Sequence, residues 1–151
     1  EGYIMSLKEL LLEDMKTAMR EKDDITKNAI QMVRSAVLQV EKDKKITLDD
    51  DGVIEVIAKE VKKRKESLPD FEKSGRQDLI DALNKEIQVL TKYLPQQLTE
   101  AELEELVKNV INENGYSSVR DMGKVMGQLM PMVKGRADGK LLNQIVRKFL
   151  S

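Results

Sequence analysis

The sequence contains no cysteine and no histidine. Their absence excludes disulfide frameworks, zinc sites built from Cys and His, thiol nucleophiles and imidazole general bases. Three prolines and eight glycines in 151 residues are too few turn formers for an all-β sandwich. No uncharged stretch approaches the roughly 18 residues of a membrane-spanning helix, and no secretory signal segment is recognisable. We therefore expect an all-α protein located in the cytoplasm.

Charge is abundant but balanced, and its distribution along the chain is uneven. Charged residues make up 35% of the chain, with 26 Lys and Arg against 27 Asp and Glu. Residues 1–96 carry 18 basic and 20 acidic side chains, residues 97–114 carry one and five, and residues 115–151 carry seven and two. The last stretch thus has a net charge of +5. Any attraction for a polyanion must be local to it.

Hydrophobic periodicity and helix caps predict four helices in an N-terminal domain, residues 5–96. Glu1–Ile4 precede a natural-looking start at Met5, so we exclude residues 1–4 from the fold as foreign to the natural chain. The first helix follows Ser6 and ends near Glu21, the second is capped by Asp24 and ends near Lys44, the third follows Asp49–Asp51, and the fourth carries Leu79, Leu83, Ile87 and Leu90 inward. Pro69 should kink or interrupt the third helix.

A smaller module of three helices is expected over residues 97–151, because Pro95 ends the preceding pattern and Thr99 with Glu102 forms a capping box. The first of its helices should stop at Asn114–Gly115. Ser118 can cap the second, which Pro131 should end, and Asp138 can cap the third. On the second helix, Met122, Met126 and Met130 have the spacing of core residues. With Met132 they could instead form an adaptable partner-binding surface.

A basic loop at Lys134–Lys140 opens the last helix and contains Gly135 and Gly139. Free backbone N–H groups, the positive end of the helix dipole and mobile cations together suit a phosphate. The loop lacks the glycine spacing and the terminal Gly-Lys-Ser/Thr of a nucleotide-binding P-loop. Ordinary turns with solvated lysines remain the alternative. A second cationic strip, at Lys59, Lys62, Lys63, Arg64 and Lys65, has interleaved glutamates, so we interpret it as a solvated face laced by ion pairs.

Two stretches carry a family resemblance, Met122–Pro131 and Val133–Arg147. Together they resemble the C-terminal signature of the GatB/YqeY family, and a looser likeness covers the rest of the chain from Met5. The resemblance implies an all-helical fold of two parts. It also implies that the C-terminal part is similar to the tail domain of the B subunit of the tRNA-dependent amidotransferase, a carbon–nitrogen ligase with glutamine as amide donor. In that enzyme the tail helps to recognise tRNA, and its catalytic portion has no counterpart in this sequence.

The resemblance and the basic C-terminal stretch together lead us to expect a tRNA-binding accessory protein that acts in translation. The expected RNA-binding residues are Lys124, Gln128, Lys134, Gly135, Arg136, Lys140 and Arg147. We expect no catalytic residue, no metal and no cofactor. The alternative is a helical protein–protein interaction module that docks on an aminoacyl-tRNA synthetase or an amidotransferase without touching RNA.

Overall fold

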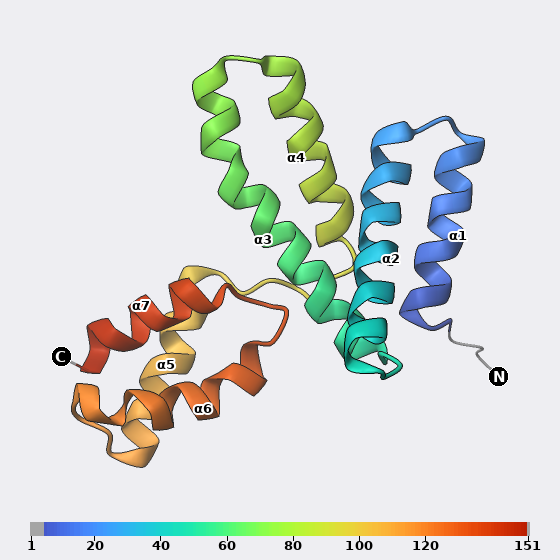
Figure 1. Cartoon of the computed structure of the whole chain (residues 1–151). Coiled ribbons are helices and arrows are strands. Elements are labelled where there is room, and N and C mark those ends of the chain that lie inside the picture. The colour runs from blue at the N-terminus through green and yellow to red at the C-terminus, as the bar shows by residue number, and fades with distance from the viewer. Residues whose placement is uncertain (1–4, 151) are drawn as a thin grey trace. The chain divides into compact units, whose positions relative to one another are not determined.

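A computed structural model describes residues 5–150, and their regular structure consists of seven α-helices and one 3₁₀ turn, without a β-strand (Figure 1). The predicted all-α class is confirmed. The chain forms two compact units, Glu1–Leu94 and Pro95–Ser151. Each unit has a hydrophobic core of its own. The interpretation of residues 1–4 as foreign to the chain lies outside the described residues.

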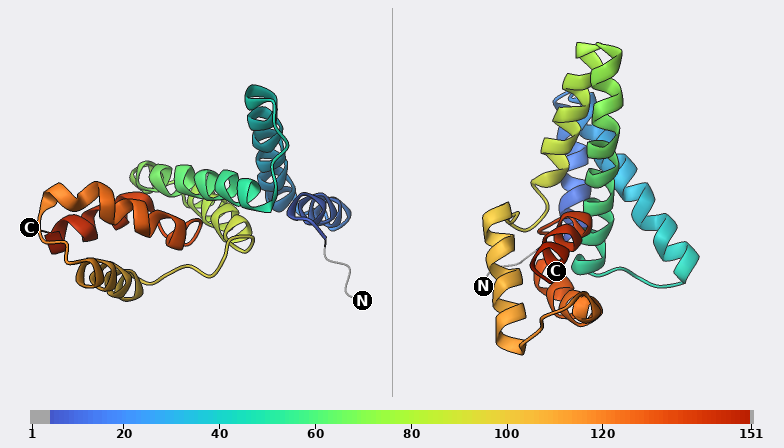
Figure 2. Two further views of the ribbon diagram at one scale, coloured as in Figure 1. Left: turned by 90° about the horizontal axis from the view of Figure 1, so that it is seen from below. Right: turned by 90° about the vertical axis from the view of Figure 1, so that its left-hand side faces the viewer.

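The first unit is built from two antiparallel helical hairpins. Helices α1 (Leu7–Arg20) and α2 (Asp24–Lys44) form one hairpin, and α3 (Asp50–Ser74) and α4 (Gln77–Thr91) form the other. The hairpins meet where α2 packs on α3 and α4 (Figure 2). Their shared core contains, among others, Leu11, Ala29, Ile30, Val33, Val53, Ile57 and Leu90.

Helix starts in this unit follow the expected side-chain caps with one exception. The Ser6 hydroxyl accepts a hydrogen bond from the Glu9 N–H at 3.2 Å. The second helix is capped by Asp23, whose carboxylate accepts from the Thr26 N–H at 3.2 Å, and not by Asp24 as predicted. Asp24 instead lies in the first turn, where an acidic side chain still favours the positive end of the helix dipole.

The predicted interruption at Pro69 is wrong, because α3 is continuous from Asp50 to Ser74. Proline removes one N–H from the ladder, and the carbonyl that loses its partner belongs to Lys65. Both residues are exposed, so water can hydrogen-bond that carbonyl. The residues on both sides of the proline pack against α4 and keep the helix in one piece. The helix ends at Gly75, as expected, in the left-handed conformation with φ of 71°.

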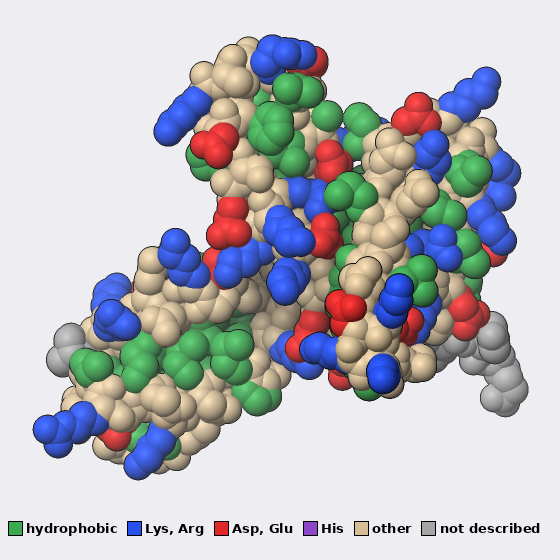
Figure 3. Space-filling view, viewed as in Figure 1, with side chains coloured by type: hydrophobic (Ala, Val, Ile, Leu, Met, Phe, Trp, Pro, Cys, Tyr) green, Lys and Arg blue, Asp and Glu red, His purple; other side chains and the backbone are tan. Residues whose placement is uncertain are grey.

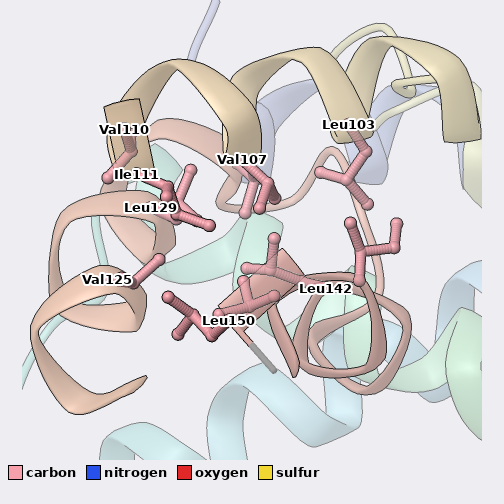
Figure 4. Packing of buried hydrophobic residues seen from close by; sticks show 11 residues of the cluster. Leu103, Val107, Val110, Ile111, Val125, Leu129, Leu142 and Leu150 are labelled. Carbon is pink, nitrogen blue, oxygen red and sulfur yellow. The ribbon is translucent and has the colours of Figure 1, made fainter. Parts of the chain in front are cut away.

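The second unit is a three-helix module made of α5 (Glu100–Asn114), α6 (Met122–Val133) and α7 (Gly139–Leu150). A 3₁₀ turn, η1 (Val119–Asp121), precedes α6. Each of the three α-helices contacts the other two. Their buried side chains converge on one core, in which Leu103 and Val107 of α5 face Leu129 of α6 and Leu142 of α7 (Figure 4).

The capping box that opens α5 is confirmed in both directions. The Thr99 N–H donates to the Glu102 carboxylate at 2.9 Å, and the Glu102 N–H donates to the Thr99 hydroxyl at 3.1 Å. The predicted stop after Asn114 is also confirmed, because Gly115 adopts a left-handed conformation with φ of 68°.

Three details of α6 differ from the sequence-based predictions. Ser118 caps the 3₁₀ turn and not the α-helix itself. The helix continues beyond Pro131 to Val133, because Val133 is buried in the core and its packing offsets one lost hydrogen bond. Met130 is not a core residue, since 47% of it is exposed. The core stripe of α6 consists instead of Val125, Leu129 and Val133.

Candidate functional site

The basic loop between α6 and α7 is tied by hydrogen bonds to the segment that leads into α5. The Arg136 Nε donates to the Gln96 carbonyl at 3.0 Å, and the Leu98 N–H donates to the Arg136 carbonyl at 2.9 Å. The Gln97 side-chain amide donates to the Gly135 carbonyl at 2.7 Å. Gly135 has a φ of 72°, which a residue with a Cβ rarely adopts. Gly135 and Arg136 therefore close the three-helix unit.

Arg136 also influences the capping box of α5. Hydrogen bonds from the Thr99 backbone and hydroxyl lower the pKa of Glu102, and the nearby positive charge of Arg136 lowers it further. The guanidinium thus stabilises two features of the same unit, the carboxylate of the cap and the carbonyl of Gln96. Sequence reasoning could not find this role, because the partners lie about 40 residues apart in the chain.

The first turn of α7 is occupied by its own cap. The Asp138 carboxylate accepts a hydrogen bond from the Lys140 N–H at 3.1 Å. This carboxylate stands where a phosphate at the helix N-terminus would sit, and its charge opposes an anion. In this arrangement the means of attracting an anion are the side chains of the surrounding cations.

The sequence-predicted site residues fall into two groups by their contacts. Lys124, Lys134, Lys140 and Arg147 are exposed. Gln128 holds the end of α5, since it donates to the Tyr116 hydroxyl at 2.8 Å and accepts from the Asn114 amide at 3.1 Å. Together with Gly135 and Arg136, it therefore serves internal contacts of the unit.

Among the exposed cations, Lys140 and Arg147 lie two turns apart on the outer face of α7. Lys148 lies on the side of that helix that faces α5, where it pairs with Glu104 at 3.3 Å and contacts the Phe149 ring. The described parts of α6 and α7 contain no Asp or Glu at all. The positive field of Lys124, Lys140 and Arg147 is therefore not cancelled on their own helices.

Acidic side chains of this unit gather on α5 instead. Glu102, Glu105 and Glu113 recur at helical spacing and are exposed. The unit is thus polarised, with carboxylates on α5 and cations on α6 and α7. Figure 3 shows Lys and Arg side chains on both sides of a band of hydrophobic side chains where α6 and α7 lie side by side.

The second cationic strip, on α3, differs from a fully solvated face at one position. Arg64 is 7% exposed and pairs with Glu86 through Nε at 2.9 Å and with Glu60 through a terminal nitrogen at 3.0 Å. Burial lowers the pKa of Arg64, but the hydrogen bonds to Glu86 and Glu60 outweigh burial and leave the pKa raised. Arg64 thus joins α3 to α4, and the prediction that it is solvated is wrong.

A cleft of about 430 Å³ lies in the first unit between α1 and the end of α4. The Tyr93 hydroxyl, at its edge, donates to the Asp14 carboxylate at 2.5 Å. Burial raises the pKa of Tyr93, and the hydrogen bond to Asp14 raises it further. Across residues 5–150, no group of three or more carboxylates is placed to hold a metal ion. None of the helices in that range is long and apolar enough to span a membrane.

Comparison with known proteins relates the chain to one family over nearly its whole length. The sequence model described as Yqey-like protein matches residues 8–150. A protein of Pyrenophora tritici-repentis named altered inheritance of mitochondria protein 41, mitochondrial, is 32% identical over 129 residues, which cover 84% of this chain and 71% of that protein. A protein of the same name from Lachancea thermotolerans is 29% identical over 99% of this chain and 83% of its own length.

A shorter match connects the chain with a tRNA-dependent enzyme. One of the subunits of the glutamyl-tRNA(Gln) amidotransferase of Thermococcus sibiricus is 40% identical over 55 residues, which cover 34% of this chain and 9% of that longer protein. The expected kinship with an amidotransferase tail is therefore confirmed. The expected cytoplasmic location is wrong by this comparison, because the relatives that match most of the chain are named as mitochondrial proteins.

Proposed function

Since the chain belongs to the YqeY-like family, we propose that it is a tRNA-binding accessory protein whose RNA contacts lie on α6 and α7. The partial match to an amidotransferase that is named for Glu-tRNA(Gln) supports tRNA as the RNA. It also supports a protein partner of the same context, an amidotransferase or an aminoacyl-tRNA synthetase. The protein contributes binding in this account, and the partner carries out the chemistry.

One observation carries the proposal, the uncancelled positive face of the second unit. Lys124, Lys140 and Arg147 are exposed on helices without a single carboxylate. Phosphate contacts supply most of the affinity of proteins for nucleic acids, and basic side chains without acidic neighbours supply those contacts. Because the acidic side chains lie on α5, only the α6–α7 face attracts a polyanion.

The proposal is tested by replacing Lys124, Lys140 and Arg147 together with Ala. These side chains project into solvent, so the helical content should stay unchanged. The variant should bind tRNA roughly 10- to 100-fold more weakly at low salt, and the slope of log K against log[salt] should fall by about 2 to 3. Fluorescence anisotropy of labelled tRNA at several salt concentrations measures both quantities.

The matched control removes the same charge from the first unit through Lys16, Lys59 and Lys65, which are equally exposed. We expect this control to keep most of the parent's affinity. An equal loss in both triple variants would mean a diffuse charge effect and would contradict the site. No binding of tRNA by the parent at about 50 mM salt would contradict the function itself and favour docking on a protein without RNA contact.

A further inference from the structure

Three methionines form a stripe along α6 that the core does not cover. Met122, Met126 and Met130 are spaced four residues apart and share one side of the helix. Met122 and Met126 are partly buried, and Met130 is 47% exposed. The sequence predicts that all three belong to the core, but the core stripe of α6 runs through Val125, Leu129 and Val133. The stripe therefore presents apolar surface to solvent, most of it at Met130.

The methionine stripe runs on the side of α6 that borders α7. Gln128, on the opposite side of the core stripe, contacts Tyr116 and Asn114 at the end of α5, so the methionines point away from α5. Figure 3 shows the resulting hydrophobic band along the line where α6 and α7 meet, with cationic side chains on both sides. Lys140 and Arg147 lie on the neighbouring helix.

We propose that this band contacts the unpaired bases of the bound RNA while Lys140 and Arg147 contact the adjacent phosphates. The inference rests on the proposed function and names the form of RNA that the site takes. A paired stem presents phosphates and sugars to a protein, and its base faces are stacked inside the helix. It would leave the exposed thioether of Met130 without an apolar partner. An unpaired nucleotide presents an apolar base face beside its own phosphate.

Charge complementarity selects a polyanion as the occupant of this band. Both helices that border it lack acidic side chains, whereas cations lie on both. The chain has no Trp, and the described part of α6 has no aromatic residue, so an aromatic stacking platform of the usual kind is not available there. Methionine is flexible and polarisable and fits irregular apolar surfaces, so it suits bases of any sequence.

The experiment compares two RNAs with equal numbers of phosphates, a blunt duplex and a hairpin with an unpaired loop. The intact protein should bind the hairpin about fivefold more tightly than the duplex at the same salt concentration, a smaller gain than aromatic stacking gives. Met130→Gln should abolish this preference and leave the slope of log K against log[salt] unchanged, because it removes no charge. Met130→Leu should keep the preference.

Met19→Gln is the matched control, since Met19 is 56% exposed on α1 in the first unit. It should change neither affinity. Circular dichroism should give the same helical content for all variants, because both methionines are exposed. Equal affinity of the parent for the two RNAs, or an equal loss for both RNAs in Met130→Gln, would overturn the inference while RNA binding itself stands. Failure to bind either RNA would overturn both proposals.

Discussion

A few polar side chains hold each unit together at particular points. In the first unit, the Tyr93 hydroxyl joins the end of α4 to Asp14 of α1, and Arg64 joins α3 to Glu86 of α4. In the second unit, Arg136 joins the loop before α7 to the segment before α5. Each of these contacts links residues more than 20 positions apart, so each fixes tertiary structure and not a single helix.

The Tyr93–Asp14 contact leads to a prediction about stability and pH. Burial and the Asp14 carboxylate raise the pKa of the Tyr93 hydroxyl in the folded state, whereas tyrosine in the unfolded chain ionises near pH 10. The stabilisation from neutral Tyr93 is complete below about pH 10 and is lost as the pH rises above that value. Tyr93→Phe should lower the free energy of unfolding by about 1–2 kcal/mol at neutral pH, as expected for a lost hydrogen bond to a charged acceptor.

Urea unfolding of the parent and of Tyr93→Phe at neutral pH and near pH 11 measures both effects. The difference between the two proteins should shrink at the higher pH, because only the parent carries this ionisable hydroxyl. A difference that stays the same or grows would show that the phenol is not protected in the folded state.

Residues whose roles depend on distant partners could not be predicted from the sequence. Arg64 lies in a run of charged residues that is typical of a solvated face, and only the position of Glu86 on α4 explains its burial. Arg136 has the sequence context of a phosphate ligand, but the Gln96 carbonyl accepts its Nε–H. Met130 has core spacing, but no neighbouring side chain covers it.

At the scale of the element, local sequence was a good guide to helix starts and stops. Caps such as Thr99 with Glu102, and left-handed glycines such as Gly75 and Gly115, act within a few residues of themselves, so their patterns predict boundaries. The prolines were a poor guide. Pro69 and Pro131 each cost one hydrogen bond at an exposed position, and packing of the residues beyond them outweighs that cost.

The glycines of the two units lead to a pair of opposite predictions. Gly127 lies inside α6, and a Cβ built on it would meet no atom within 4 Å. Gly127→Ala should therefore raise the free energy of unfolding by about 0.5–1 kcal/mol, because alanine loses less backbone entropy in a helix. Gly75 also has open space, but its φ is +71°. Gly75→Ala should lower the free energy of unfolding by about 1–2 kcal/mol.

Thermal and urea unfolding of both alanine variants measure these changes. The same chemical substitution should thus give effects of opposite sign, decided by backbone conformation alone. A loss of stability in Gly127→Ala would show that something in the folded unit requires a glycine at that position of α6.

At the scale of the whole molecule, the sequence predicts a division near residue 97, and the structure divides the chain after Leu94. The pattern break at Pro95 marks this region because the proline ends one hydrophobic period before the next begins. The segment at Gln96–Leu98 then belongs with the second unit, since it is hydrogen-bonded to Gly135 and Arg136. Those bonds are long-range, so the position of this short segment could not be predicted.

The polarity of the second unit is the feature of the molecule on which the proposed function depends. Its cations are on α6 and α7 and its carboxylates on α5, although the total charge of the chain is only −1. Composition alone therefore hides the feature, and the partition of charge along the sequence reveals its sign and its place. The contacts of the structure then separate the cations that point outward from Arg136, which closes the fold.

A titration of isotopically labelled protein with tRNA, followed by backbone amide NMR, tests this account most directly. Shifts should concentrate on α6 and α7, near Lys124, Lys140 and Arg147, because the positive field of the unit is strongest there. The amides around Glu105 and Glu113 on α5 should not move. Shifts centred on α5 or on the Lys59–Lys65 strip, or no shifts at low salt, would contradict the account.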